Sequence, residues 1–187
     1  MSRTLQCALV VWLGLWGSAA YAEPPGAWLD VPFVQQERNG CGAASIAMVM
    51  HYWERQQGKD ASADADAAQI QRALYSEKTG GIYASDLERY FEQHQFRAFA
   101  FRGEWSDLKQ HVEKGRPLIV ALKPGAGAPL HYVVVVGIEG EQRLILVNDP
   151  ARRKLLKQEW SDFEKEWKGA GNWTLLAVPP TGSPSAR

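Results

Sequence analysis

The hydrophobic residues between about 41 and 57 follow the period of an α-helix. Apolar side chains recur there three or four positions apart, and no proline interrupts the segment. They are Ile46, Val49, Met50 and Trp53. Asn39 is a suitable N-cap residue and Gly40 permits a sharp turn, so the pattern predicts a helix with Cys41 in its first turn.

The same period predicts shorter helices further along the chain. One covers residues 67–75, and three others begin at Ser85, Ser106 and Ser161. The three serines are expected N-caps, and Glu88 completes a capping box with Ser85. In the helix that begins at Ser106, the period places His111 on the outward face.

Strand patterns dominate the second half of the chain. Residues 131–138 give the strongest signal, and a turn over 139–142 followed by a second run over 143–148 completes a hairpin. Further strands are predicted at residues 29–34, 96–101, 117–122 and 173–178. Pro32 confines the first of these to a sheet edge. The chain is thus predicted to form one α+β domain over residues 29–178, with an N-terminal helical part packed on a small antiparallel sheet.

The first residues are typical of an export signal. One basic residue precedes an apolar run over residues 8–16, and Ala20-Tyr21-Ala22 supplies a small-x-small cleavage pattern. We predict a signal peptide at residues 1–22, a linker at 23–28 and a disordered tail at 179–187. The apolar run is too short to span a bilayer comfortably, so we expect no stable membrane span after cleavage and a periplasmic or secreted protein.

Charge and composition exclude several classes of function. The chain has 21 Lys and Arg against 21 Asp and Glu, with no basic stripe, so nucleic acid is not an expected partner. Nothing in the sequence resembles a metal-ligand cluster or requires an organic cofactor, and we expect neither. The sequence leaves the oligomeric state open.

Cysteine usage points to a reactive thiol. The sequence has 2 cysteines, of which Cys7 would leave with the signal peptide. Cys41 would then be a single thiol in a compartment that oxidises thiols, where pairs normally form disulfides. Its place at a helix N-terminus favours the thiolate over the thiol. Cys41 is therefore our candidate nucleophile.

The hairpin offers this thiol a base and an acid. Residue numbers that face one another in an antiparallel hairpin have a constant sum, here about 280 or 281 for a turn near Gly140. His131 and Asp149 are therefore predicted to face one another at its open end, or to lie within one position of doing so, where facing residues have Cβ atoms roughly 5 Å apart. At that distance the imidazole can donate a hydrogen bond to the carboxylate. Cys41, His131 and Asp149 form a candidate catalytic triad.

A fourth residue is needed to stabilise the developing oxyanion. Attack on a carbonyl places negative charge on its oxygen, which the backbone N–H of Cys41 and a side-chain amide can bind together. Gln35 and Gln36 both lie shortly before Cys41. The residues alone leave the choice between them open.

Several motifs occur together in a characteristic order. They are Gln35 six residues before Cys41, Cys41-Gly42-Ala43-Ala44 with Ala47-Met48, Gly115-Arg116-Pro117-Leu118-Ile119, His131-Tyr132-Val133-Val134 with Gly137, and Asn148-Asp149-Pro150. With these motifs the chain resembles, over roughly residues 29–178, the papain-like peptidases that trim double-glycine leaders from bacteriocins and related peptides, cysteine peptidase family thirty-nine.

The resemblance implies a papain-like fold and a set of roles. Cys41 would be the nucleophile, His131 the base, Asp149 the orienting acid and Gln35 the side-chain donor of the oxyanion hole. It also implies cleavage after a Gly-Gly or small-residue pair. The best known members are cytoplasmic domains of ABC exporters, whereas this chain has a signal peptide and no transporter. We therefore expect an exported peptide or protein as the substrate.

Two other functions fit parts of the pattern. A cell-wall peptide hydrolase or transpeptidase would also place a cysteine at a helix start, although the Gln35 spacing and Asp149-Pro150 fit that class less well. A non-catalytic peptide-binding accessory of a secretion system would use the same fold with a vestigial triad. The complete set of Cys41, His131, Asp149 and Gln35 argues against such decay.

Overall fold

A seven-stranded antiparallel sheet is the framework of the structure, a computed structural model that describes residues 26–140 and 143–180. The strands are β1 (Ala27–Trp28), β2 (Arg97–Arg102), β3 (Leu118–Leu122), β4 (His131–Glu139), β5 (Leu144–Asp149), β6 (Arg153–Glu159) and β7 (Trp173–Val178). Their order across the sheet is β2-β7-β3-β4-β5-β6, and β1 pairs with β4 beside this path. The predicted α+β class is confirmed.

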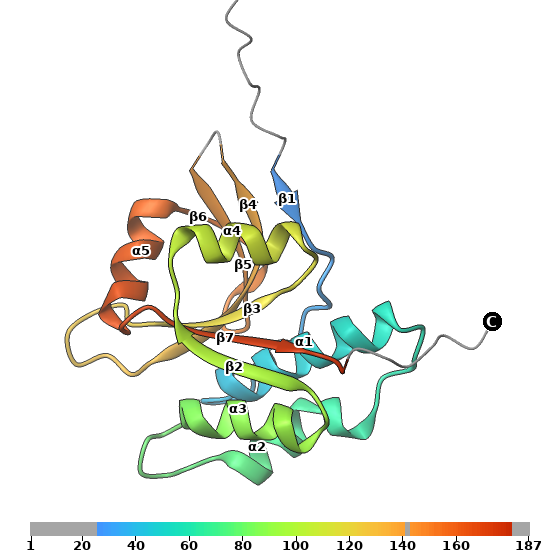
Figure 1. Ribbon diagram of the computed structural model, residues 1–187. Coiled ribbons are helices and arrows are strands. Elements are labelled where there is room, and N and C mark those ends of the chain that lie inside the picture. The colour runs from blue at the N-terminus through green and yellow to red at the C-terminus, as the bar shows by residue number, and fades with distance from the viewer. Residues whose placement is uncertain (1–25, 141–142, 181–187) are drawn as a thin grey trace, which may run out of the picture.

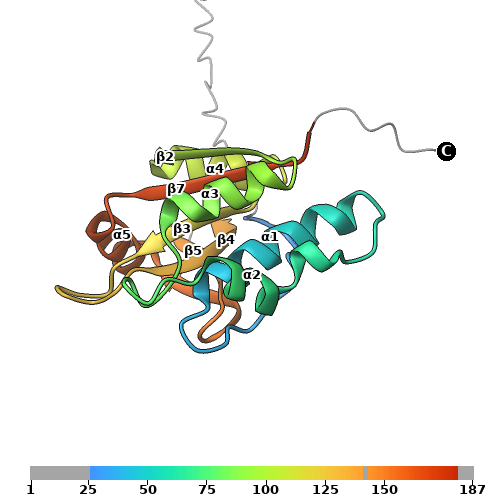
Figure 2. The ribbon, with the colours of Figure 1, turned by 90° about the horizontal axis from the view of Figure 1, so that it is seen from below.

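Helices cover both faces of this sheet (Figure 1). They are α1 (Cys41–Gln56), the 3-10 helix η1 (Ala63–Ala65), α2 (Ala67–Leu74), α3 (Ala84–Gln93), α4 (Trp105–Glu113) and α5 (Trp160–Gly169). α1, α2 and α3 contribute to one hydrophobic core and α4 and α5 to another. In Figure 1, α4 lies above the strands β2, β3 and β7, and α1, α2 and α3 lie below them. Figure 2 is the view from below, in which α3 lies in front of β7. The side chains of β4 alternate between the cores, which is the period of a strand buried on both faces.

Helix α1 is deeply buried in the fold. Every residue from Gly42 to Met50 is buried. Gly42 permits a close approach, since a Cβ there would lie 3.2 Å from the Cβ of Ile82. The predicted start of this helix is confirmed at Cys41, but its cap is different. Gly40 occupies the N-cap position without a side-chain hydrogen bond, and Asn39 lies before it with φ 57°.

The predicted serine caps of the shorter helices are wrong. The helices begin at Ala84, Trp105 and Trp160, two residues earlier than a serine cap requires, so each serine lies inside the first turn. Tyr83, Glu104 and Glu159 are the N-cap residues, all in extended backbone conformation. Glu104 forms a reciprocal capping box with Asp107 at α4, in which each side chain accepts from the backbone N–H of the other residue.

His111 on α4 does not face outward as predicted. Its ring centroid lies 6.3 Å from that of Phe101, and Nδ1 is buried. Burial, followed by the positive charge of Arg116, lowers the pKa of His111. Phe101 of β2 lies beside this ring, so contact with the sheet, and not the helical period, accounts for its burial.

The edges of the sheet differ most from the predicted strands. Residues 29–34 do not form a strand, and the chain instead joins the sheet earlier, in the predicted linker, where Ala27 and Trp28 pair with Ile138 and Gly137. β6 was not predicted, because its alternation is largely polar and its side chains are mostly exposed or half-buried. Backbone pairing with β5 holds it in the sheet.

Some predictions fall outside the part of the chain that the structure describes. They are the signal peptide at residues 1–22, the first residues of the linker, the tip of the predicted turn at 141–142, and the tail from residue 181 onward. Among the described residues, no helix is both long enough and apolar enough to cross a membrane.

Candidate active site

Cys41 is the first residue of α1 and is half-buried, with its thiol not engaged in a disulfide. The residue before it, Gly40, donates its backbone N–H to the carbonyl of Glu37 at 3.0 Å and accepts from the N–H of Ala44 at 2.9 Å. The turn that leads into the helix is therefore closed by backbone hydrogen bonds. Since the following helical turns are buried, the sulfur is held at a fixed point of the fold.

His131 and Asp149 form a hydrogen bond at adjoining strand ends. His131 begins β4, Asp149 ends β5, and the distance from His131 Nε2 to Asp149 Oδ1 is 2.8 Å. The carboxylate side chain is 8% exposed and the imidazole 23%. Water is thus nearly excluded from the acid but still reaches the ring, as a base that contacts substrate requires.

The predicted contact is present, although the predicted register is wrong. Val134 faces Asn148, so the same register continues with Asp149 opposite Val133 and not opposite His131. The connection between β4 and β5 is displaced by one residue from the predicted turn, and an irregularity follows at Val135. His131 reaches Asp149 diagonally, which is possible because diagonal neighbours across two strands are about 7–8 Å apart at Cα and long side chains span that distance.

The electrostatics of the pair favour an imidazolium. Burial by itself lowers the pKa of His131, but hydrogen bonds with Asp149 and with Cys41, and the negative charge of both, raise it to about 9. Burial likewise acts to raise the pKa of Asp149, and the hydrogen bond and charge of His131 outweigh it and hold that pKa below 3.8. At neutral pH the ring therefore carries a proton between the carboxylate and the Cys41 sulfur.

Backbone and side-chain amides fix the acid in place. Asp149 Oδ1 also accepts from the backbone N–H of Ala151 at 2.9 Å. The fully buried Asn148 donates to the carbonyl of Val31 at 3.1 Å and accepts from the N–H of Leu155 at 3.0 Å. Sequence reasoning did not identify these partners. The Asp149-Pro150-Ala151 turn could have suggested one of them, because Asp side chains often accept from the N–H two residues ahead.

Tyr132 connects this strand to the segment that precedes α3. Its hydroxyl donates to the carbonyl of Ile82 at 3.4 Å, and Ile82 packs against Gly42. Burial, followed by the negative charges of Cys41 and Asp86, raises the pKa of Tyr132, so the phenol remains protonated. Ile82 and Tyr132 thus form a neutral wall beside the nucleophile, which sequence reasoning also missed.

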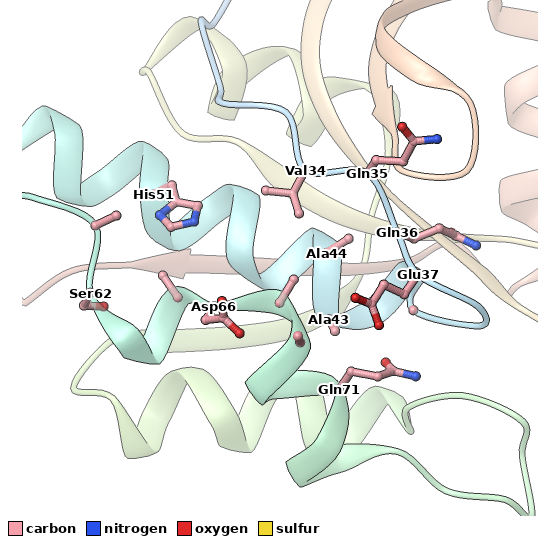
Figure 3. A pocket seen from close by; sticks show the side chains of 15 residues that line it. Val34, Gln35, Gln36, Glu37, Ala43, Ala44, His51, Ser62, Asp66 and Gln71 are labelled. Atoms are coloured by element: carbon pink, nitrogen blue, oxygen red, sulfur yellow. The ribbon is translucent and has the colours of Figure 1, made fainter.

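The two glutamines before Cys41 have different environments. Gln35 is exposed, whereas Gln36 is half-buried and its Oε1 is buried without a hydrogen-bond partner. The backbone N–H of Gln36 donates to the carbonyl of Pro150 at 3.0 Å, which ties this residue to the turn that follows Asp149. Figure 3 shows the two side chains leaving the loop in different directions. The backbone of Gln36 is therefore tied to the turn that follows Asp149.

The fold and this arrangement of a helix-start cysteine with a strand-end histidine and acid define a papain-like cysteine peptidase. The model of the family described as Peptidase_C39 like family matches residues 28–175, and the chain belongs to this family. A comparison with curated proteins found no match.

Solved structures share the fold at low sequence identity. A C39-like peptidase from Bacillus anthracis has a TM-score of 0.64 and 17% identity, covering 85% of this chain and 100% of its own. A double glycine motif protease from an AMS/PCAT transporter, in complex with the leader peptide, has a TM-score of 0.59 and 22% identity, covering 82% and 95%. Xylellain, a cysteine protease from Xylella fastidiosa, has a TM-score of 0.59 and 11% identity, covering 85% and 87%.

Proposed function

We propose that this protein is an exported cysteine endopeptidase that hydrolyses peptide bonds through a Cys41-His131-Asp149 triad and an acyl-thioester intermediate. The observation that carries the proposal is that His131 is hydrogen-bonded to Asp149 at 2.8 Å, while Cys41, at the start of α1, is near enough to raise the pKa of the ring. A thiol at the start of a buried helix, with a histidine between it and a buried carboxylate, has the geometry of an activated nucleophile.

Acylation begins from the ion pair of Cys41 and His131. The sulfur attacks the carbonyl carbon of the scissile bond, and the carbonyl oxygen becomes an oxyanion. His131 then gives its proton to the leaving nitrogen as the C–N bond breaks, which leaves a thioester on Cys41 and releases an amine. Asp149 holds the ring in place through Nε2–H, so that the other ring nitrogen faces the sulfur.

Deacylation reverses the role of the histidine. Neutral His131 accepts a proton from water, and the hydroxide equivalent attacks the thioester carbon. The C–S bond breaks, the acid product leaves, and the imidazolium with its sulfur partner is restored. No metal or organic cofactor takes part in this proposal.

For the oxyanion we assign the side-chain donor to Gln36 instead of the spacing-based candidate Gln35. Gln36 is tied to Pro150 through its backbone, and its enclosed Oε1 leaves Nε2 on the other side of the amide. In Figure 3 the amide nitrogen of Gln36 points away from the hollow. The N–H of Cys41 would be the second donor.

The two glutamines can be separated by paired alanine variants. Because one oxyanion donor is worth roughly 10²–10³ in kcat, we expect Gln36→Ala to lower kcat by about that factor with little change in KM. Gln35→Ala is the matched control and should change kcat less than about threefold. Steady-state kinetics on a fluorogenic peptide measure both. The opposite ranking would return the role to Gln35, as the family resemblance implies.

The pH profile tests the charge of Asp149. Since the pKa of His131 is about 9, kcat/KM should fall as the pH rises through about 9, where the ring loses the proton that the leaving nitrogen needs. Asp149→Asn keeps an oxygen that accepts from Ala151 and His131 but removes the negative charge, so the fall should move to lower pH. An unchanged profile in Asp149→Asn would contradict the proposed role of the acid.

The substrate and the location are the finer parts of the proposal. One similar structure is a double glycine motif protease bound to a leader peptide, which supports a peptide substrate and motivates cleavage after Gly-Gly or another small pair. Peptides with Gly-Gly before the scissile bond should be cleaved fastest, those with Ala-Gly more slowly and those with Leu-Leu slowest.

Mass spectrometry of the N-terminus of the protein in each cell fraction tests export. An uncleaved chain in the cytoplasm would overturn that part of the proposal.

A further inference from the structure

A hollow of about 390 Å³ lies beside the loop that leads into α1. Its walls come from residues 34–40, the first turns of α1, and the η1 and α2 segment that crosses below them (Figure 3). Small side chains make the space, since five of its lining residues within the helices are alanines. They are Ala43, Ala44, Ala65, Ala67 and Ala68. The hollow is therefore a slot with apolar walls directly behind the residue that precedes Cys41.

The enclosed polar atoms of this hollow are hydrogen-bond acceptors. Gln36 Oε1 and Gln71 Oε1 are both buried without a partner. Gln71 Nε2 donates to the carbonyl of Asn39 at 3.5 Å. This hydrogen bond orients the amide and leaves Oε1 as its atom without a partner. Buried acceptors normally have a donor. These two oxygens therefore lack the donor that a ligand would bring.

The charges around the hollow have one sign. Glu37 and Asp66 line it, and no lysine or arginine does. Among residues 26–140 and 143–180 neither carboxylate has a salt-bridge partner, although Asp66 Oδ1 caps α2 by accepting from Gln69 N–H at 2.8 Å. His51 also lines the hollow, and its Nδ1 lies 3.3 Å from Glu54 Oε2. Figure 3 shows Glu37 and Gln71 pointing toward one another across the space.

Free acceptors, unpaired carboxylates and an alanine-lined slot together match an aliphatic chain that ends in a cationic donor group. We propose that this hollow binds the ammonium or guanidinium group of a lysine or arginine side chain of the peptide substrate. The methylene groups would pack on the alanines, and the cation would donate to Gln36 Oε1, Gln71 Oε1 and the Glu37 carboxylate. This specificity site rests on the proposed peptidase function.

The position of the hollow links it to the chemistry. Gly40 and Gln36 line it, and these residues flank the turn into Cys41. A donor on Gln36 Oε1 holds the amide whose nitrogen we assign to the oxyanion hole. A basic side chain in the hollow would thus orient that donor as well as anchor the peptide.

Binding is tested separately from catalysis with the Cys41→Ala protein. We would titrate it with N-acetyl-lysine methylamide and follow the alanine methyl resonances by NMR. We expect saturable shifts at Ala43 and Ala44, at least tenfold weaker binding of the uncharged N-acetyl-norleucine methylamide, and at least tenfold weaker binding of the lysine probe to Glu37→Gln/Asp66→Asn. Asn at position 66 keeps an oxygen for the helix cap. Equal affinity for the two probes, or for the two proteins, would overturn the site.

Two further experiments control for unfolding of the variants and identify the molecule that supplies the cation. Glu113→Gln, an exposed charge change on α4, should leave lysine binding unchanged, and matching melting temperatures exclude unfolding of the double variant. We would also compare peptide substrates in which lysine or norleucine stands at one position at a time. At one position, KM should be at least tenfold lower for lysine than for norleucine with the wild-type protein. The double variant should not distinguish the two peptides. Binding of the probe without any such position would assign the hollow to a free amine and overturn the substrate role. Probe binding with no peptide cleaved would contradict the peptidase proposal and leave the hollow as a cation site.

Discussion

Replacing Cys41 with alanine is expected to lower kcat for peptide hydrolysis by roughly 10⁴-fold or more. The reason is that the sulfur forms the acyl intermediate, and no other cysteine lies among residues 26–140 and 143–180 to replace it. Cys41 is half-buried at the tip of α1 and packs only at the edge of the core, where a smaller apolar side chain is tolerated. The variant should therefore fold. Initial rates on a fluorogenic peptide, with the melting temperature measured in parallel, provide the test.

Cys41→Ser is the matched control for this variant. It keeps the shape of the site and replaces the sulfur with a less acidic hydroxyl, so binding of substrate should persist while turnover remains at least 10³-fold below that of the wild type. Turnover of Cys41→Ala at the wild-type rate would eliminate the thiol mechanism. Full biological activity of an inactive Cys41→Ala protein in cells would favour the non-catalytic peptide-binding function instead.

Replacing His131 with alanine is the second change for which we expect a loss of roughly 10⁴-fold in kcat. The variant removes the proton donor of acylation and the base of deacylation at once, and it leaves the buried Asp149 without its ring partner. Because the ring begins β4 and is 23% exposed, its removal should affect turnover far more than folding. Single-turnover measurements that separate acylation from deacylation should show both steps slowed.

Added imidazole distinguishes a chemical role from a structural one. It can enter the space left by the ring and exchange protons, so it should partly restore turnover of His131→Ala and leave Cys41→Ala inactive. His94→Gln serves as a histidine control, because His94 caps the end of α3 and stacks on Tyr90. A comparable loss of activity in that variant would show that the effect of His131→Ala does not report on the triad.

The sequence predicted the buried elements of the fold better than its edges. α1 and β4 have strong apolar patterns, because burial constrains every position along them. β6 is held by pairing with β5, and β1 by pairing with β4, so neither needs an apolar pattern of its own. Helix starts were misplaced for a related reason. A serine near a helix start is a good local signal, but the path of the incoming chain decides which residue takes the cap.

The site was predictable as far as chemistry and spacing reach. Cys41, His131 and Asp149 were predicted as a group, and the hydrogen bond between His131 and Asp149 is present. Spacing could not decide between Gln35 and Gln36, because consecutive residues of an extended loop point in different directions. The diagonal geometry of the His131–Asp149 contact depends on the irregular register at Val135, which no residue pattern announces.

The burial of the nine residues from Gly42 to Met50 limits how such an enzyme can be kept inactive. A nucleophile rooted in the interior cannot be withdrawn by a small hinge motion, because any displacement would unpack the whole domain. Latency in this architecture must therefore come from obstruction: an inhibitor, a propeptide or a partner that occupies the entrance and leaves the thiol where it is.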